Sequence, residues 1–329
     1  MTPAEPMTPA VSVVMVTYQT RELTRRALTG LLGTPSAVPY EVIVVDNAST
    51  DGSAEAIRAE FPAVRVVRLA RNVGFGRAVN VGAERAHGRW VLLVNPDTEP
   101  VGDVIAELVR FASANPEHGI YTGRTLRPDG TDDGHSVFGL PGLWSYACFA
   151  VGLSTLFRRS RLVNPEELPG LSRSTAATVP AVSGCLLLVE RALFAELGGF
   201  APEYFMYSED IDLCVRAARR GARPALVPTA RLLHVGGGAS TSGGKRVMVL
   251  RGKVTYLRSH WSVPRAAAGR ALLATGVAAR AAGARLTGRA GYWREVWHRR
   301  AEWLAGWPPP EHLPAVRLVT PHPTDAPTT

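Results

Sequence analysis

The sequence predicts an α/β protein with a mostly parallel central sheet flanked by helices, and two observations carry that prediction. Short apolar runs, typical of buried strands, alternate with helix-length segments over the first 95 residues. Several of these runs end in acidic or amide side chains, and parallel α/β sheets bind ligands beyond the carboxyl ends of their strands. The 329 residues, 46% of them hydrophobic, are enough to bury a sizeable core.

The N-terminal elements are expected in the order strand, helix, strand, helix. The helix expected at 20–32 carries Leu23, Ala27 and Leu31 on one face, and the Gly-Thr-Pro stretch at 33–35 stops it. The expected strands are 11–18, 40–50, 63–70 and 89–94, and the remaining helices are 51–61 and 74–88. Residues 120–180 combine a turn-rich loop with an apolar, aromatic stretch. After them we expect a strand and a helix in 179–200, a helix at 203–221 and a last strand within 223–241 that runs into a glycine-rich loop.

The C-terminal part has a different composition. Apolar residues at steps of three and four predict an amphipathic helix that Pro264 interrupts; they are Val247, Leu250, Val254, Leu257 and Trp261. The tail from Pro308 is proline-rich and expected to be disordered. We therefore divide the chain into a disordered N-terminus (1–10), a main domain (11–240), a basic helical segment (245–304) and a Pro-rich tail (305–329).

Charge is concentrated in one part of the chain. The net charge is +9, and residues 245–304 hold 13 basic and 2 acidic side chains, while the remainder is nearly neutral. Such a segment, in which Trp and Arg interleave, suits an anionic membrane surface. A solvated helical cap or a homodimer interface remains an alternative, whereas nucleic-acid binding is not expected.

Other features suggest a cytoplasmic protein. No apolar stretch reaches the ~18 residues of a membrane span, and the first ten residues lack the basic and apolar regions of a secretory signal. The three cysteines, Cys148, Cys185 and Cys214, have no paired spacing and are expected to be reduced thiols.

The segment "RWVLLVNPDTEP", residues 89–100, places an acid at the end of a buried strand. Pro96 cannot extend a strand ladder, so it stops the strand and presents Asp97 at the sheet edge. A hard divalent cation prefers oxygen ligands and often keeps waters and substrate phosphates in its coordination shell. Asp97 is therefore a candidate ligand for Mg²⁺ or Mn²⁺, and His234 could add a nitrogen.

Two further segments suit a nucleotide. Asp46, at the end of the second strand, can accept the imide N–H of a uracil or thymine ring, although a local turn is an equal alternative. In "RNVGFGRAVNVG", a glycine loop opens a helix whose free N–H groups suit phosphates, and Arg71 and Arg77 can pair with diphosphate oxygens. A dinucleotide-binding domain is rejected, because the first strand-to-helix turn has no glycine and Val79 stands where the third glycine belongs.

The segment "YSEDIDLC" holds three acids at the start of a helix, where the helix dipole stabilises them. Ser208 can cap that helix. Because Glu209 and Asp210 are adjacent, they point in different directions. One can bind a substrate hydroxyl while the other takes its proton as a general base.

Together these segments resemble bacterial family 2 glycosyltransferases of the GT-A fold, and among them rhamnosyltransferases. The resemblance rests on "VTYQTRELTRRAL", "VVDNASTDGS", "RNVGFGRAVNVG", "LLVNPDTEP", "SGCLLLVER", "FMYSEDIDLCVRA" and "LLHVGGGAS", in that order over about residues 11–240. It implies a GT-A sheet with a Rossmann-like nucleotide-binding half, an inverting reaction, and residues 120–180 as a variable acceptor-side region.

The resemblance also implies a role for each matching residue. Asp210 is the catalytic base, Asp97 binds the metal, and His234 contacts the metal or diphosphate. The implied acceptor residues are Glu209, Ser183 and Gly184. The implied nucleotide-sugar residues are Thr17, Tyr18, Asp46, Asn72, Gly74, Gly76, Arg77, Asn80 and Asn95. Asn95 stands where the family's Asp-x-Asp motif has its first Asp.

The donor expected by resemblance is dTDP-L-rhamnose. The expected acceptor is a cell-envelope glycan or a polyprenyl-diphosphate-linked sugar, which places the enzyme peripherally on the cytoplasmic face of the membrane. Alternatives are another nucleotide sugar such as a UDP-sugar, a sugar nucleotidyltransferase, or a non-catalytic membrane-associated glycan-binding module.

Overall fold

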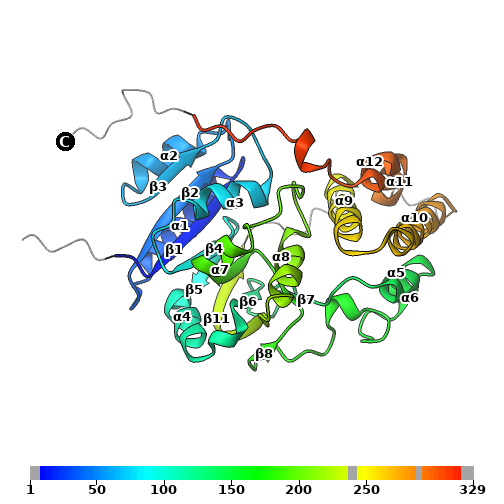
Figure 1. Cartoon of the computed structure of the whole chain (residues 1–329), viewed down its shortest axis with the longest axis horizontal. Helices are drawn as coiled ribbons and strands as arrows, with labels where there is room; N and C mark the ends of the chain where they lie inside the picture. Colours follow the sequence, from blue (N-terminus) through cyan, green and yellow to red (C-terminus); the bar gives the residue numbers. More distant parts are fainter. Residues whose placement is uncertain (1–7, 236–242, 287–290, 320–329) are drawn as a thin grey trace, which may run out of the picture.

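The computed structural model describes residues 8–235, 243–286 and 291–319, and it has a mixed α/β body beside a helical unit (Figure 1). The body contains a nine-stranded sheet in the order β3-β2-β1-β4-β10-β6-β11-β5, with β8 paired to β11. Its strands are β1 (Val11–Thr17), β2 (Tyr40–Asp46), β3 (Arg65–Arg68), β4 (Trp90–Val94), β5 (Thr98–Val101), β6 (Ile120–Leu126), β8 (Ala177–Thr178), β10 (Leu186–Glu190) and β11 (Ala225–His234). A small separate sheet pairs β7 (Val137–Phe138) with β9 (Ala181–Val182).

The predicted α/β fold is confirmed, with parallel pairing among β3, β2, β1 and β4. The other half of the sheet is mixed. β10 runs antiparallel between β4 and β6, and β5 runs antiparallel to β11. An apolar run alone does not reveal the direction of its strand, and β5 is not among the strands expected from the sequence.

Helices cover both faces of the sheet because the central strands are apolar on both sides. Along β1, Val14 and Val16 face one core and Val13 and Met15 face the other. The helices of the body are α1 (Arg21–Gly33), α2 (Ser53–Glu60), α3 (Phe75–Ala83), α4 (Val104–Ala114), α7 (Arg191–Glu196) and α8 (Glu209–Ala218). Single-turn 3₁₀ helices lie at Pro116–His118, Pro165–Glu167 and Pro310–His312.

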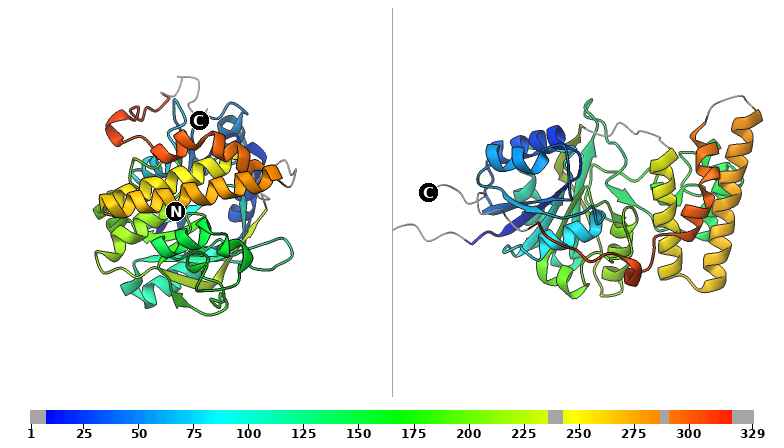
Figure 2. Two further views of the ribbon diagram at one scale, coloured as in Figure 1. Left: turned by 90° about the vertical axis from the view of Figure 1, so that its right-hand side faces the viewer. Right: turned by 90° about the horizontal axis from the view of Figure 1, so that it is seen from above.

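The helical unit comprises α9 (Gly243–His260), α10 (Val263–Leu286), α11 (Tyr292–His298) and α12 (Arg300–Ala305), with α5 (Leu143–Ala150) and α6 (Leu153–Leu156) packed against them (Figure 2). The predicted apolar stripe lies on α9, and Pro264 stands in the first turn of the next helix. Four stripe residues are buried in the core of this unit, where they pack with residues such as Trp303. The stripe is therefore a packing face and not an exposed membrane face.

Many of the Arg and Trp side chains of this unit also stack on each other. Arg251 lies over Trp307 at 4.0 Å and Arg265 over Trp261 at 4.3 Å from the ring centres. Among the described residues, no helix has the length and apolar composition needed to cross a membrane.

The chain after α12 differs from the expected disorder over residues 308–319. It runs back from the helical unit to the edge of the body, beside β3 (Figures 1 and 2). There Val319 donates its N–H to the Arg68 carbonyl, and Ala70 donates to the Arg317 carbonyl, each at 2.9 Å. Backbone pairing with the sheet edge accounts for the order of a segment whose composition predicts none. Residues 1–7, most of the expected disordered N-terminus, and 320–329 lie outside the described residues.

Candidate active site

The polar residues predicted at strand ends do meet along one edge of the sheet. Thr17 and Asp46 are the last residues of the paired strands β1 and β2, and Asn95 follows β4. β10 starts at the same edge, because Leu186 pairs with Val94 in antiparallel register. The antiparallel insertion thus brings the loop before β10 next to the segment that carries Asp97.

Asp46 is fully buried, and one of its carboxylate oxygens has no hydrogen-bond partner. Its Oδ1 accepts the Ser49 N–H at 3.1 Å, whereas Oδ2 has only Arg68 Nε at 3.6 Å. Burial raises the pKa of Asp46. An unpaired buried acceptor is costly, so a ligand N–H placed against Oδ2 would remove that cost. The local turn uses Oδ1, and Oδ2 is left without a hydrogen-bond partner.

Thr17 and Tyr18, also predicted for the nucleotide pocket, lie at the end of β1, where Thr17 pairs with Asp46 of β2. Thr17 is buried, and its hydroxyl contacts the hydroxyls of Thr20 and Thr24 at 3.0 and 2.9 Å. Tyr18 is 46% exposed and is available for stacking from the surface.

The glycine loop before α3 is held by amide side chains. Asn72 Oδ1 accepts the Asn47 amide at 3.0 Å and the Gly74 N–H at 2.9 Å. Gly74 has φ +88°, and a Cβ there would lie 2.2 Å from the Phe205 carbonyl oxygen. Phe75 donates its N–H to that same carbonyl at 2.8 Å. The glycine is therefore required so that the loop before α8 can lie directly on the start of α3.

Three other residues predicted for the sugar-diphosphate have definite contacts in the protein. Gly76 is buried against Phe200. Arg77 donates to the Pro314 carbonyl in the C-terminal segment at 2.7 Å. Both ends of the Asn80 side-chain amide bond the backbone of Phe200, at 2.8 and 2.9 Å. It thus fastens α3 to the turn after α7.

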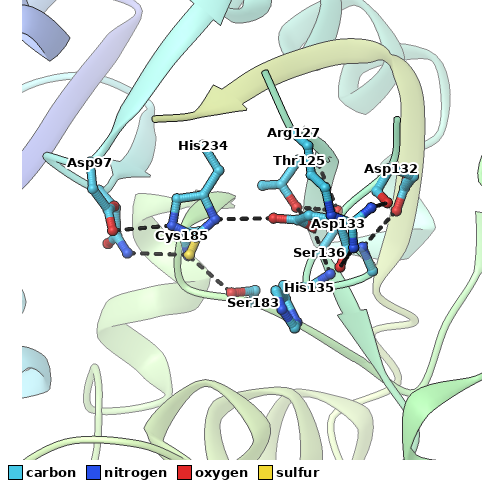
Figure 3. Close-up of polar contacts among 12 residues, drawn as sticks. Asp97, Thr125, Arg127, Asp132, Asp133, His135, Ser136, Ser183, Cys185 and His234 are labelled. Carbon is cyan, nitrogen blue, oxygen red and sulfur yellow. Dashed lines mark hydrogen bonds and ion pairs between the residues drawn. The ribbon is translucent and has the colours of Figure 1, made fainter. Parts of the chain in front are cut away.

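Asp97 and His234 are brought together by the pairing of β5 with β11. His234 lies opposite Thr98, and its Nε2 is 3.1 Å from Asp97 Oδ2 (Figure 3). On the other side of the ring, Nδ1 is 3.0 Å from Asp133 Oδ2. The two carboxylates therefore flank one imidazole and raise its pKa to about 9, with Asp133 the stronger influence.

Asp133 is a site residue that the sequence analysis missed. It lies in the turn-rich loop after β6, where its carboxylate also accepts the Thr125 hydroxyl and the His135 N–H, the latter at 2.8 Å. Burial opposes its charge, but the bonds from His234 and Thr125 outweigh burial and lower its pKa. Its signal was the motif "DDGH", which composition alone assigns to an ordinary turn.

The Asp97–His234 pair fits a divalent cation in two respects. Asp97 Oδ1 is buried without a hydrogen-bond partner, and the Asp133 carboxylate contacts His234 at Nδ1, which leaves Nε2 as the nitrogen that would bind a cation in place of its proton. In the described parts of the chain, no cluster of three or more metal-binding side chains occurs. A cation held here would take its remaining ligands from water and substrate phosphates.

Asn95 and the loop before β10 surround the half-buried thiol of Cys185. Asn95 donates its amide to Cys185 Sγ at 3.2 Å, and Ser183 Oγ accepts the Cys185 N–H at 3.2 Å. Burial, reinforced by Asp97 and Asp210, raises the pKa of Cys185 to about 12. A neutral thiol thus lies beside Asn95 and Ser183, a feature not foreseen from the sequence.

Asp210 is anchored at the start of α8. It accepts the Gly184 N–H at 3.1 Å and the Ile211 N–H at 2.8 Å. Glu209 is 5% exposed, and its Oε2 has no hydrogen-bond partner. Burial raises the pKa of both carboxyls, and the charge of Asp210 adds to the effect on Glu209. Ser208 stands at the N-cap as expected, but with φ +73° its side chain makes no capping bond.

These acidic side chains act on the same neighbours. The charges of Asp97, Asp133 and Asp210 all raise the pKa of Cys185, and those of Glu209 and Asp97 raise the pKa of Tyr207. The Asp46 side of the edge is joined to this group through Asn47, the glycine loop and Phe205. Asp46, the Asp97–His234 pair and the Glu209–Asp210 pair thus lie along one edge of the sheet.

Comparison with known proteins assigns this arrangement to a family. The pattern described as "Glycosyl transferase family 2" matches residues 12–194. The chain is 33% identical over 247 residues to N-acetylglucosaminyl-diphospho-decaprenol L-rhamnosyltransferase of Mycobacterium tuberculosis, covering 69% of this chain and 76% of that protein.

Two solved structures share the fold. The mannosyltransferase PcManGT of Pyrobaculum calidifontis, in complex with GDP-Man and Mn²⁺, aligns with TM-score 0.56 and 22% identity over 91% of this chain and 86% of that one. GalNAc-T7 with UDP, GalNAc and Mn²⁺ aligns with TM-score 0.56 and 17% identity over 79% of this chain and 49% of that one. With the sheet edge described above, these matches lead to the conclusion that the chain is a glycosyltransferase of family 2, similar to rhamnosyltransferases.

Proposed function

We propose that the protein is an inverting, metal-dependent transferase that moves L-rhamnose from dTDP-L-rhamnose to a hydroxyl of a polyprenyl-diphosphate-linked glycan. The observation that carries the proposal is the common edge that holds Asp46, Asp97 and Asp210. The mycobacterial relative supports the donor and acceptor, since its name specifies L-rhamnose and a diphospho-decaprenol-linked sugar.

In this proposal Asp46 reads the base. Its unpaired Oδ2 accepts the ring N–H of thymine, and the exposed Tyr18 ring covers the base from outside. The glycine loop before α3 is the proposed diphosphate contact; its Gly74 and Phe75 N–H groups already bond Asn72 and the Phe205 carbonyl, so the contact comes from other groups of the loop.

Asp210 is the proposed general base. Its two backbone hydrogen bonds fix the carboxylate, and the raised pKa gives it more affinity for a proton than an ordinary aspartate has. As the acceptor oxygen attacks the anomeric carbon, its proton passes to Asp210. The bond to the nucleoside diphosphate breaks with its electron pair on the leaving oxygen. One displacement of this kind inverts the anomeric configuration.

The remaining groups bind and orient. Glu209 binds an acceptor hydroxyl, and the Ser183–Gly184 segment sets the position of Asp210. Asp97 and the Nε2 atom of His234 would hold Mg²⁺ or Mn²⁺. When bound, that cation supplies charge neutralisation for the departing diphosphate.

The proposed domain division places catalysis in residues 11–240. The helical unit at 245–304 belongs to the acceptor side, and the protein works peripherally at the cytoplasmic face of the membrane.

The test is release of dTDP from dTDP-L-rhamnose with a lipid-linked acceptor, with and without Mn²⁺. Asp210→Asn should lose ~10²-fold or more in kcat while dTDP binding is unchanged. Asp132→Asn, which alters an acid outside the site, should keep normal turnover. Near-normal turnover of Asp210→Asn would remove that residue from the role of base, and a higher rate with a UDP-sugar would overturn the donor.

A further inference from the structure

A large open cavity lies away from the sheet edge, between α5–α6 and the C-terminal helices. Its volume is about 1120 Å³, and a smaller cavity of about 170 Å³ adjoins it. Both share Phe149, Arg246 and Trp293 in their lining. Nothing in the proposed transfer chemistry uses this space.

The larger cavity is cationic. Arg158, Arg246 and Arg280 line it, against the single acid Glu167. Among the described residues, no carboxylate lies within ion-pair distance of any of the three guanidinium groups. The described partners of Arg280 are neutral oxygens, at 2.8 Å in the Phe149 carbonyl, 2.9 Å in the Gly276 carbonyl and 2.9 Å in the Thr155 hydroxyl. These positive charges therefore lack a counter-ion within the described chain.

Aromatic rings hold two of these arginines in place. Arg280 lies 3.9 Å above the Phe149 ring, and Trp293 has both Arg246 and Arg280 at 5.5 Å from its centre. Burial lowers the pKa of Arg280, and repulsion by the nearby charge of Arg246 lowers it further. An anion bound between the two guanidinium groups would relieve the repulsion and gain charge-assisted hydrogen bonds.

The rim of the cavity is apolar and exposed. Val151 lines the cavity and is 72% exposed, and Leu156 and Phe157, which lie in the chain between the lining residues Thr155 and Arg158, are 74% and 51% exposed. Single exposed apolar residues are common, but a group of them beside an arginine cluster has the two-part character of a lipid headgroup site.

The two cavities also lie close to the turn at Tyr207 that precedes Asp210. Leu250 and Lys253 of α9 line the smaller cavity, while Gly252 on the same helix meets the backbone of Tyr207. A Cβ at Gly252 would lie 2.2 Å from the Tyr207 carbonyl oxygen, so the helix lies directly on the turn that leads to Asp210. The cavities and that turn are thus separated by about one helix width, ~10 Å.

We propose that this cavity binds the diphosphate of a membrane lipid through Arg158, Arg246 and Arg280, with the hydrocarbon chain along Val151, Leu156 and Phe157. The proposal rests on the proposed function in that the lipid is the anchor of the acceptor. A saccharide on that diphosphate then extends past α9 toward Asp210.

The experiment measures binding of farnesyl diphosphate to the full chain by Trp fluorescence and calorimetry, with inorganic pyrophosphate and farnesol as separate probes. Arg246→Gln should weaken farnesyl diphosphate binding at least ~10-fold, because it removes a charge-assisted contact. Arg158→Gln, on an exposed side chain, should weaken it several-fold without a folding defect. Arg159→Gln is the matched control, since Arg159 is exposed next to Arg158 but lines neither cavity.

The apolar half is tested in the same way. Val151→Ser should weaken farnesyl diphosphate binding but not pyrophosphate binding, whereas Val263→Ser, also exposed but in the lining of neither cavity, should change neither. Equal affinity of wild type, Arg246→Gln and Arg158→Gln for farnesyl diphosphate would overturn the proposal. Pyrophosphate binding as tightly as farnesyl diphosphate would reduce the site to one for small anions and refute the lipid.

Donor binding separates this inference from the proposed function. dTDP affinity should be the same in wild type and Arg246→Gln. If dTDP-L-rhamnose is not turned over while farnesyl diphosphate binding follows the expected pattern, the cavity proposal holds and the donor assignment fails. If turnover of dTDP-L-rhamnose is normal and the arginine variants bind farnesyl diphosphate like wild type, the donor assignment holds and the cavity proposal fails.

Discussion

Replacing Asp133 by Asn should lower both the pKa of His234 and the stability of the metal-free protein. His234 lies between Asp133 and Asp97, at 3.0 and 3.1 Å, and its pKa is raised from 6.5 to about 9. A shift of about 2.5 units corresponds to ~3.4 kcal/mol of preference for the charged ring. Because Asp133 has the larger influence, Asp133→Asn should remove more than one unit, or ~2 kcal/mol.

The sign of the pH dependence follows from the raised pKa. The stabilisation by charged His234 is fully present below pH ~6.5, where the ring is protonated in both folded and unfolded chains. It is lost as pH rises through about 9, the pKa in the folded protein. The difference in free energy of unfolding between wild type and Asp133→Asn should therefore be ~2 kcal/mol at pH 6, shrink as pH rises toward 9, and be nearly absent above pH 9.

The assay is NMR titration of the His234 ring in EDTA, with urea denaturation at pH 6 and pH 9.5. Asp132→Asn is the control, because Asp132 is the adjacent acid and pairs with Arg124 and Arg173 instead. An unchanged His234 titration in Asp133→Asn would refute the reasoning, and so would a stability difference that is the same at both pH values.

Three other predictions concern the site and its support. Asp46→Asn should weaken dTDP binding ~10-fold by calorimetry, since a charged acceptor is lost; inorganic pyrophosphate binding should not change, and unaltered dTDP affinity would contradict base reading. Gly252→Ala should cost ~1–3 kcal/mol in urea denaturation, because its Cβ meets backbone. Gly30→Ala, in a helix with its nearest neighbour at 3.5 Å, should instead stabilise by ~0.5–1 kcal/mol, and similar effects for the two glycines would be evidence against the close approach. Burial raises the pKa of Asp210, so kcat/KM should fall on acidification at a pH above the ordinary aspartate range; a limb within that ordinary range would contradict a buried base.

Local pattern was sufficient for much of the nucleotide-binding half. The apolar runs of β1, β2 and β4 are buried on both faces, and their polar ends carry Asp46 and Asp97, as expected. The apolar stripe on α9 could also be predicted, since apolar residues spaced three and four apart indicate a helix with one buried face. In each case the signal lies within a few consecutive residues.

Other features depended on contacts between distant parts of the chain. The direction of β10 depends on the strands that pair with it, and the partner of the α9 stripe depends on the helices that pack against it. Neither can be read from a short stretch of sequence. Asp133 and His234 are 101 residues apart in the chain and meet only because β6 and β11 pair side by side. The sequence by itself therefore determined the α/β class, the buried strands and the acids at their ends. Only the tertiary structure decided which distant groups those acids meet, because strand pairing and side-chain electrostatics act through space.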